Sequence, residues 1–237
     1  MLFGGLQVFD RDGYDITKSL SPLIRELFLV VLLYSIKWGK GISTEKLTEI
    51  LWFDKSVDSA RNNRSVNIAK LKIILEKMDS CQISKDTGYW KINFDEGKVN
   101  IDYNRYLLII NAKGKIDRQK VDDLTEIVQR GSFLSNVEYE WLDVYKSEIS
   151  NEIIDSYLHY AATIDMKNDP ELLIKLASLV FYFDPVNEEA TVIQCRALVY
   201  LGKHSLAKSK FENFVKEYKN IYGEEFKQTF NEVVEEP

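Results

Sequence analysis

The hydrophobic pattern of the first hundred residues changes repeatedly between the period of strands and the period of helices. Residues 6–10 and 14–17 alternate apolar and polar side chains around Asp12-Gly13, which is typical of two short strands joined by a tight turn. A second alternating pair flanks a glycine-containing turn and predicts a β-hairpin over residues 82–92. Between the two pairs, apolar residues recur at helical spacing in three stretches, which are 22–38, 44–51 and 59–78.

Local sequence signals place the ends of these helices. Ser21 and Pro22 supply a capping hydroxyl and a proline at the first helical position, and Gly39 is a suitable C-cap. Ser43 is expected to cap the second helix. A loop over residues 52–58 then separates the second helix from the third.

The third helix has two faces of different chemistry. Its apolar residues recur at helical spacing and predict a buried stripe, which consists of Ile68, Leu71, Leu75 and Met78. Polar residues are expected on another face, which is led by Asn63, Asn67 and Lys70. Asparagine amides can pair bidentately with adenine, and lysine or arginine reaches guanine or phosphate, so this second face suits base readout.

Helical periodicity takes over from residue 101, and strand signals disappear. The stretches expected to be helical are 103–111, 118–130, 139–163, 170–182, 187–201, 205–222 and 225–234. Helices joined by short turns favour stacked antiparallel hairpins. The sequence therefore predicts an α+β domain over residues 1–102 and an all-α helical-repeat domain over residues 103–237.

The net charge of -6 averages two unlike halves of the 237-residue chain. Residues 1–110 carry 16 basic and 14 acidic side chains, whereas residues 111–237 carry 15 basic and 23 acidic ones. Within residues 59–91 there are 7 basic and 3 acidic side chains. A local excess of positive charge in an acidic protein favours a polyanionic partner.

A strand pair, three helices and a hairpin, in that order, are typical of a winged helix-turn-helix that binds double-stranded DNA. The residues expected to contact DNA lie on the third helix and on the hairpin. Those of the helix are Arg61, Asn62, Asn63, Arg64, Asn67, Lys70 and Lys72. Those of the hairpin are Lys85, Thr87 and Lys91.

No catalytic, metal or cofactor site is expected. Cys81 and Cys195 match no metal or redox spacing, and His159 and His204 have no partner at ligand or triad spacing. Phosphate-binding glycine motifs and nucleophile motifs are absent from the sequence. The longest apolar run, residues 27–33, is too short to span a bilayer and predicts a buried helix. With no secretory signal at its start, the chain is expected in the cytoplasm.

Several motifs resemble those of a known family. Residues 59–76 are similar to the third helix of OmpR/PhoB-like winged helices, and Leu2-Phe3-Gly4, Leu47 to Trp52 and Gly88-Tyr89 add to the likeness. The whole chain resembles SARP-type transcriptional activators, because residues 131–134, 141–142 and 184–190 look like their bacterial transcriptional activator domain.

This resemblance implies a tetratricopeptide-type fold for the second domain and an activator function. It further implies contact with RNA polymerase and binding, as a homodimer, to repeated promoter half-sites. The family usually has an arginine-rich turn where this chain has Lys70-Leu71-Lys72-Ile73, which keeps the charge but loses the planar guanidinium that recognises guanine.

Two alternatives stay open at this point. A winged helix that no longer touches DNA, joined to a helical-repeat surface, would make the chain a protein-interaction adaptor. Chains of this kind can also form the cytoplasmic tail of a larger membrane-anchored sensor.

Overall fold

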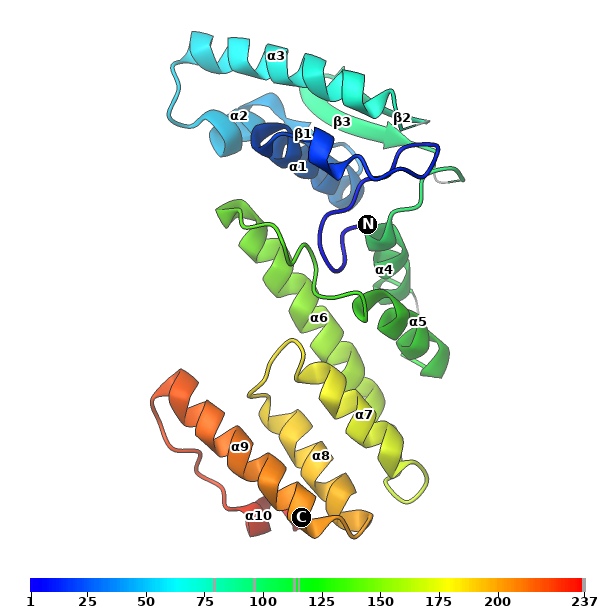
Figure 1. The fold of residues 1–237 in the computed structure, drawn as a ribbon, viewed down its shortest axis with the longest axis vertical. Helices are drawn as coiled ribbons and strands as arrows, with labels where there is room; N and C mark the ends of the chain where they lie inside the picture. Colours follow the sequence, from blue (N-terminus) through cyan, green and yellow to red (C-terminus); the bar gives the residue numbers. More distant parts are fainter. Residues whose placement is uncertain (79, 96, 113, 115, 236–237) are drawn as a thin grey trace. The chain divides into compact units, whose positions relative to one another are not determined.

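The computed structural model describes residues 1–78, 80–95, 97–112, 114 and 116–235. The chain divides into two compact units (Figure 1). Unit 1 contains residues 1–108 and 128–145, and unit 2 contains residues 109–127 and 146–237. Residues 103–108 and 128–145 thus pack with the first unit, so the units alternate along the sequence. The functional boundary between residues 102 and 103 stays a prediction.

Unit 1 combines a small sheet with helices. Its elements are η1 (Thr17–Ser19), α1 (Pro22–Trp38), β1 (Ile42–Ser43), α2 (Thr44–Trp52), α3 (Val57–Leu75), β2 (Cys81–Asp86), β3 (Tyr89–Phe94), α4 (Asp102–Ile110, up to residue 108) and η2 (Glu140–Leu142). The three expected helices and the hairpin are confirmed. Residues 27–33 are buried within α1, as expected. No helix in the described part of the chain is long and apolar enough to cross a membrane.

The ends of the helices differ in detail from the expected ones. Ser21 precedes α1, but its side chain makes no capping hydrogen bond. Ser56 caps α3 by accepting from the backbone N–H of Ser59, so this helix begins before the predicted start. Beyond Leu75 the backbone tightens, because the N–H of Met78 bonds to the carbonyl three residues back. Met78 therefore lies outside the helix and is half-buried.

The sheet is antiparallel, in the order β1–β3–β2. Its hairpin register pairs Ile83 with Ile92, and β1 pairs with β3 through Ile42 and Trp90. Because β1 has two residues, which lie opposite Tyr89 and Trp90, it has no residue opposite Ile92. The buried Ser35 of α1 supplies the acceptor there: its Oγ accepts the N–H of Ile92 at 2.9 Å and donates to the carbonyl of Val31. A helix side chain thus continues the strand ladder.

Only a short part of the strand pair expected over residues 6–17 forms, with backbone hydrogen bonds from the N–H of Asp10 to the carbonyl of Tyr14 and from the N–H of Ile16 to the carbonyl of Val8. The structure has one antiparallel bridge there, between Phe9 and Asp15, and then the short helix η1. Side chains take up other backbone donors that a longer ladder would use. Asp10 Oδ1 accepts from the N–H of Asp12 and of Tyr14, and Thr17 Oγ1 accepts from Val8. Local side-chain bonds of this kind compete with strand pairing.

A buried carboxylate at the start of α4 holds the beginning of the chain. Asp102 is 5% exposed and accepts the N–H of Leu2 at 2.7 Å and that of Phe3 at 3.0 Å. Gly4 follows with a φ of +77°, and a Cβ at this position would lie 2.0 Å from the carbonyl oxygen of Arg130. Residues 2–4 are therefore fixed between α4 and the segment that begins near residue 130.

Unit 2 is built from antiparallel helices. They are α5 (Arg118–Val128, up to residue 127), α6 (Asp143–Ala161, from residue 146), α7 (Pro170–Val180), α8 (Glu188–Tyr200), α9 (His204–Tyr222) and α10 (Phe230–Val234). Within this unit α8 packs against α7, α9 and α10 (Figure 1). Asp169 and Asn187 cap α7 and α8. The expected stacked helical hairpins are thus present in residues 146–235.

The last helix is joined to α8 by both apolar and polar contacts. Cys195 and Val233 are buried in one cluster with Phe211 and Phe214. Burial raises the pKa of the Cys195 thiol to about 11, so this cysteine packs as a small apolar side chain. Arg196 of α8 donates to the carbonyl of Val233 at 2.8 Å, which satisfies a carbonyl at the end of α10.

The Asp102 bonds predict a large effect of Asp102→Ala. The substitution leaves two buried N–H donors without an acceptor, and we expect a loss of about 3 kcal/mol from the free energy of unfolding of unit 1. All four tryptophans of the chain lie in unit 1, so their fluorescence during urea denaturation reports this unit. Hydrogen exchange at Leu2 and Phe3 should accelerate in the variant. Glu49→Ala, which removes an exposed ion pair with Lys46 in the same unit, should cost below about 0.5 kcal/mol. Equal losses in both variants would contradict this account of Asp102.

Candidate nucleic-acid interface

Helices α2 and α3 form a helix-turn-helix that is held together by side chains. Ser43 caps α2 by accepting from the N–H of Lys46. Arg64 of α3 donates from Nη1 to Oγ1 of Thr48 on α2 at 2.8 Å, and that hydroxyl donates in turn to the carbonyl of Thr44. Arg64, expected as a DNA anchor, therefore links the two helices and is half-buried.

The buried face of α3 differs from the expected one. Its buried residues are Ala60, Asn67, Ile68, Leu71 and Leu75. Asn67 is 7% exposed, and its amide donates to the carbonyl of Asn63 at 2.8 Å. The amide of Asn63 likewise donates to the carbonyl of Ser59. The expected reading face led by Asn63, Asn67 and Lys70 is thus corrected: both asparagine amides bond to the helix backbone, and Lys70 alone of the three is exposed.

The exposed face of α3 is polar and positively charged. Its exposed residues between positions 61 and 73 are Arg61, Asn62, Ser65, Val66, Ala69, Lys70, Lys72 and Ile73. Asp58 is the one acidic residue in the sequence of this helix. Arg61, Lys70 and Lys72 form no ion pair with any residue that the structure describes. Their charges are therefore available to a polyanion.

Two acidic side chains near α3 are already paired with lysines. Lys46 lies 2.7 Å from Glu49 on α2, and this hydrogen bond raises the pKa of the lysine. Lys55 lies 2.7 Å from Asp54 in the loop before α3, and it lowers the pKa of that carboxyl. Both pairs are exposed, so they reduce local negative charge without adding much stability.

The tip of the hairpin is fixed to the start of α2. Thr87 and Gly88 form its turn with φ values of +44° and +90°, both in the left-handed region that such two-residue turns require. The carbonyl of Gly88 accepts from the N–H of Thr44 at 3.0 Å and from its hydroxyl at 2.8 Å. This hairpin of β2 and β3, called the wing below, therefore has a defined position relative to the helix-turn-helix.

The three expected wing residues have different environments. Lys85 and Thr87 are exposed, whereas Lys91 is half-buried. The ammonium of Lys85 lies 5.3 Å from the centre of the Trp90 ring, which is a cation–π contact. The wing thus presents one well-exposed cation close to its turn.

Sequence reasoning missed Thr44 and Thr48, which position the wing and Arg64. Their partners are 44 and 16 residues away along the chain, so no local pattern marks these contacts. It also omitted Ser65, which is exposed on α3. Helical spacing from Asn62 to Ser65 would have placed both on one face.

The described residues contain no group of three His, Cys, Asp or Glu side chains that could hold a metal ion. Cys81 is buried, and burial raises the pKa of its thiol to about 11. A thiol with this pKa carries little thiolate at neutral pH and is a poor ligand or nucleophile.

The comparisons with known proteins show a likeness of fold. No family model matches the sequence, and no curated protein matches it either. Among solved structures, the chain is similar to EmbR of Mycobacterium tuberculosis in complex with a low-affinity phosphopeptide, with a TM-score of 0.67 and 14% sequence identity. The match covers 98% of this chain and 62% of that chain, so this chain spans less than two thirds of the matched protein. At this identity the likeness shows a shared fold.

The link between α2 and α3 predicts a measurable coupling. Arg64→Ala and Thr48→Val each remove one side of the hydrogen bond, and we expect each to lower the free energy of unfolding of unit 1 by about 1 kcal/mol. The double variant should lose less than the sum of the two, because both changes break the same bond. Tryptophan fluorescence in urea measures all three variants. Strict additivity would show that the Arg64 contact with Thr48 contributes nothing.

Proposed function

We propose that the chain is a DNA-binding transcriptional regulator, and that it acts as an activator. The observation that carries this proposal is the exposed face of α3, where Arg61, Lys70 and Lys72 have no anionic partner among the described residues. An exposed cationic helix face of this kind fits the major groove of double-stranded DNA.

The geometry of α3 assigns base recognition and contact with the DNA phosphates to different residues. A helix of 19 residues is about 28 Å long and extends beyond a major groove about 12 Å wide. Asn62 lies in the middle of the exposed face and supplies an amide for base edges. Ser65 is exposed as well, but its hydroxyl donates to the carbonyl of Arg61 at 3.0 Å, so it offers a base edge an acceptor only. Lys70 and Lys72 project about 160° apart around the helix axis. They can therefore contact the phosphates of the two strands that flank the groove.

The wing supplies a further contact in this proposal. Lys85 and Thr87 are exposed beside a turn that Thr44 fixes, so they can contact an adjacent phosphate. Lys91 is half-buried and contributes less. Asn63, Arg64 and Asn67 support the helix and its packing rather than touching bases.

The remaining partners are proposed from family resemblance and fold. The likeness to EmbR, a SARP-type regulator, supports membership of the SARP-type activators. On that basis we propose that residues 1–102 bind DNA and that the helical repeats of residues 103–237 form the tetratricopeptide-type activator domain. Contact with RNA polymerase, dimeric binding to repeated half-sites and a cytoplasmic location belong to the same proposal.

The salt dependence of DNA binding tests the proposal directly. The logarithm of the affinity for a promoter fragment should fall linearly with the logarithm of salt concentration, because phosphate contacts release counterions. Lys70→Ala and Lys72→Ala should each flatten the slope of this line by about 0.9 and weaken binding to all DNA sequences alike.

The exposed Lys208 of unit 2 provides a charge-matched control, and Lys208→Ala should leave the slope unchanged. Absence of binding to any duplex at low salt would overturn the proposal. Pull-downs that recover protein but never DNA would then favour the adaptor function.

A pair of asparagine variants separates base recognition from packing. Asn62→Ala should relax base preference at one position, by roughly 1–3 kcal/mol, because an exposed amide is lost. Asn67→Ala should leave the preferred sequence unchanged and lower the stability of unit 1 by about 1 kcal/mol, because a buried hydrogen bond is lost. Selection from random duplexes measures the first effect and urea denaturation the second. If Asn67→Ala changes the preferred sequence and Asn62→Ala does not, the assignment of faces is wrong.

A further inference from the structure

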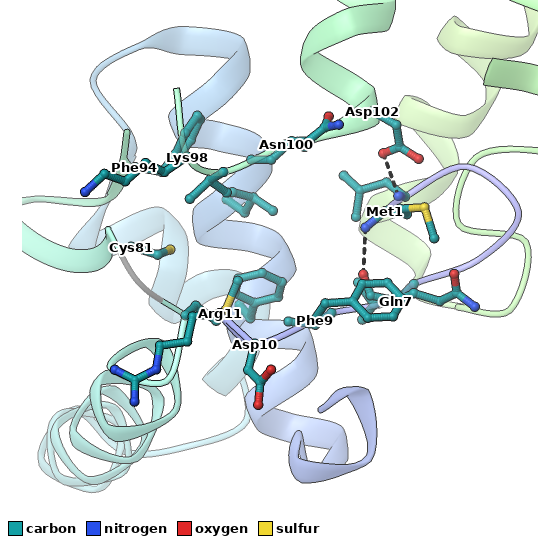
Figure 2. Close-up of a pocket in the computed structure, with 18 of the residues that line it drawn as sticks. Met1, Gln7, Phe9, Asp10, Arg11, Cys81, Phe94, Lys98, Asn100 and Asp102 are labelled. Carbon is teal, nitrogen blue, oxygen red and sulfur yellow. Dashed lines mark hydrogen bonds between the residues drawn. The ribbon is translucent and has the colours of Figure 1, made fainter. Parts of the chain in front are cut away.

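Unit 1 contains a cavity that DNA binding does not explain. Its volume is about 600 Å³, which is within the range of small-molecule sites. The walls come from the N-terminal segment, α1, the segment after α3, the hairpin and the segment before α4 (Figure 2). Most of the lining is apolar and includes Leu2, Leu6, Val8, Phe28, Leu32 and Phe94. Such walls favour a ligand with a large hydrocarbon part.

The two carboxylates that line the cavity are already engaged. Asp102 accepts two backbone N–H groups and lies 3.9 Å from the guanidinium of Arg130. Asp10 accepts two backbone N–H groups of the following loop. Neither carboxylate needs a cationic ligand to satisfy it.

Three cationic side chains line the cavity and are also exposed, so they lie at its opening. They are Arg11, Lys98 and Arg130, and Arg130 is engaged with Asp102. Lys98 forms no ion pair with any described residue. Arg11 lies 3.7 Å from Asp12, and because both side chains are about two-thirds exposed this pair is weak. Figure 2 shows Lys98 and Arg11 toward the end of the cavity that holds Cys81, with Met1 and Gln7 at the other end. The opening therefore favours an anion.

We propose that this cavity binds a single-chain amphiphile of the fatty-acid class. Its hydrocarbon chain lies among Leu6, Phe28 and Leu32, and its carboxylate lies near Lys98 and Arg11. A flexible chain suits walls that are contributed by several separate segments. The proposal concerns a site distinct from the exposed face of α3 and does not depend on DNA binding.

Calorimetric titration of the full chain with laurate, below its micelle concentration, tests the site. We expect saturable binding to one site, with methyl shifts at Leu6 and Leu32 in NMR spectra and none at Leu173 or Leu198 of unit 2. Dodecyltrimethylammonium, which has the same chain length and a cationic head, should bind at least about 10-fold more weakly. Lys98→Glu should weaken laurate binding by about 5-fold, since an attractive charge becomes repulsive.

Lys208→Glu makes the same charge change on unit 2 and should leave laurate binding intact. Lys98 is exposed, so its variant should keep the tryptophan-monitored unfolding transition of the wild type. Three results would overturn the proposal: no saturable binding of laurate, methyl shifts confined to unit 2, or equal binding of the anionic and cationic amphiphiles. Unchanged laurate affinity in Lys98→Glu would overturn the assigned position of the carboxylate.

Discussion

The organisation of unit 1 depends on one buried carboxylate. Asp102 has little contact with water, so its charge must be compensated by donors within the protein. The chain supplies the N–H groups of Leu2 and Phe3 from 100 and 99 residues away. This arrangement places the centre of the Phe3 ring 5.5 Å from the ring centres of both Tyr106 and Phe133, and Phe3 packs against both side chains. The donors that Asp102 requires thus position the aromatic side chain of Phe3. The N-terminal segment that supplies them also forms one wall of the cavity.

The periodic elements of the fold could be predicted from the sequence, whereas the extent of the first strand pair could not. The helix over 22–38 contains a continuous apolar run, the helix over 44–51 has one apolar face, and the structure confirms both helices. Residues 6–17 also alternate, but Asp10 and Thr17 offer oxygens that take the backbone donors of their neighbours. The alternation of apolar and polar residues indicates which side chains face inward. It does not indicate which acceptor a backbone N–H bonds to.

For the candidate site, the sequence predicted the helix α3 but misjudged which of its residues face outward. Polar character suggested that Asn67 is exposed, yet it adjoins Ile68 and lies on the buried face, where its amide bonds to the helix backbone. A short polar side chain can be buried when it finds a local acceptor. The bonds from Thr44 to Gly88 and from Arg64 to Thr48 join distant residues, so they follow from the tertiary structure and not from any spacing.

The double hydrogen bond from Thr44 to Gly88 has a consequence for any ligand of the hairpin. A free hairpin tip samples many conformations, and a partner that captures it must offset the conformational entropy that is lost. Here the tip is ordered before any encounter, because the turn geometry and the start of α2 already restrict it. The wing is therefore preorganised, and a contact made through Lys85 or Thr87 contributes to affinity without the cost of ordering a loop.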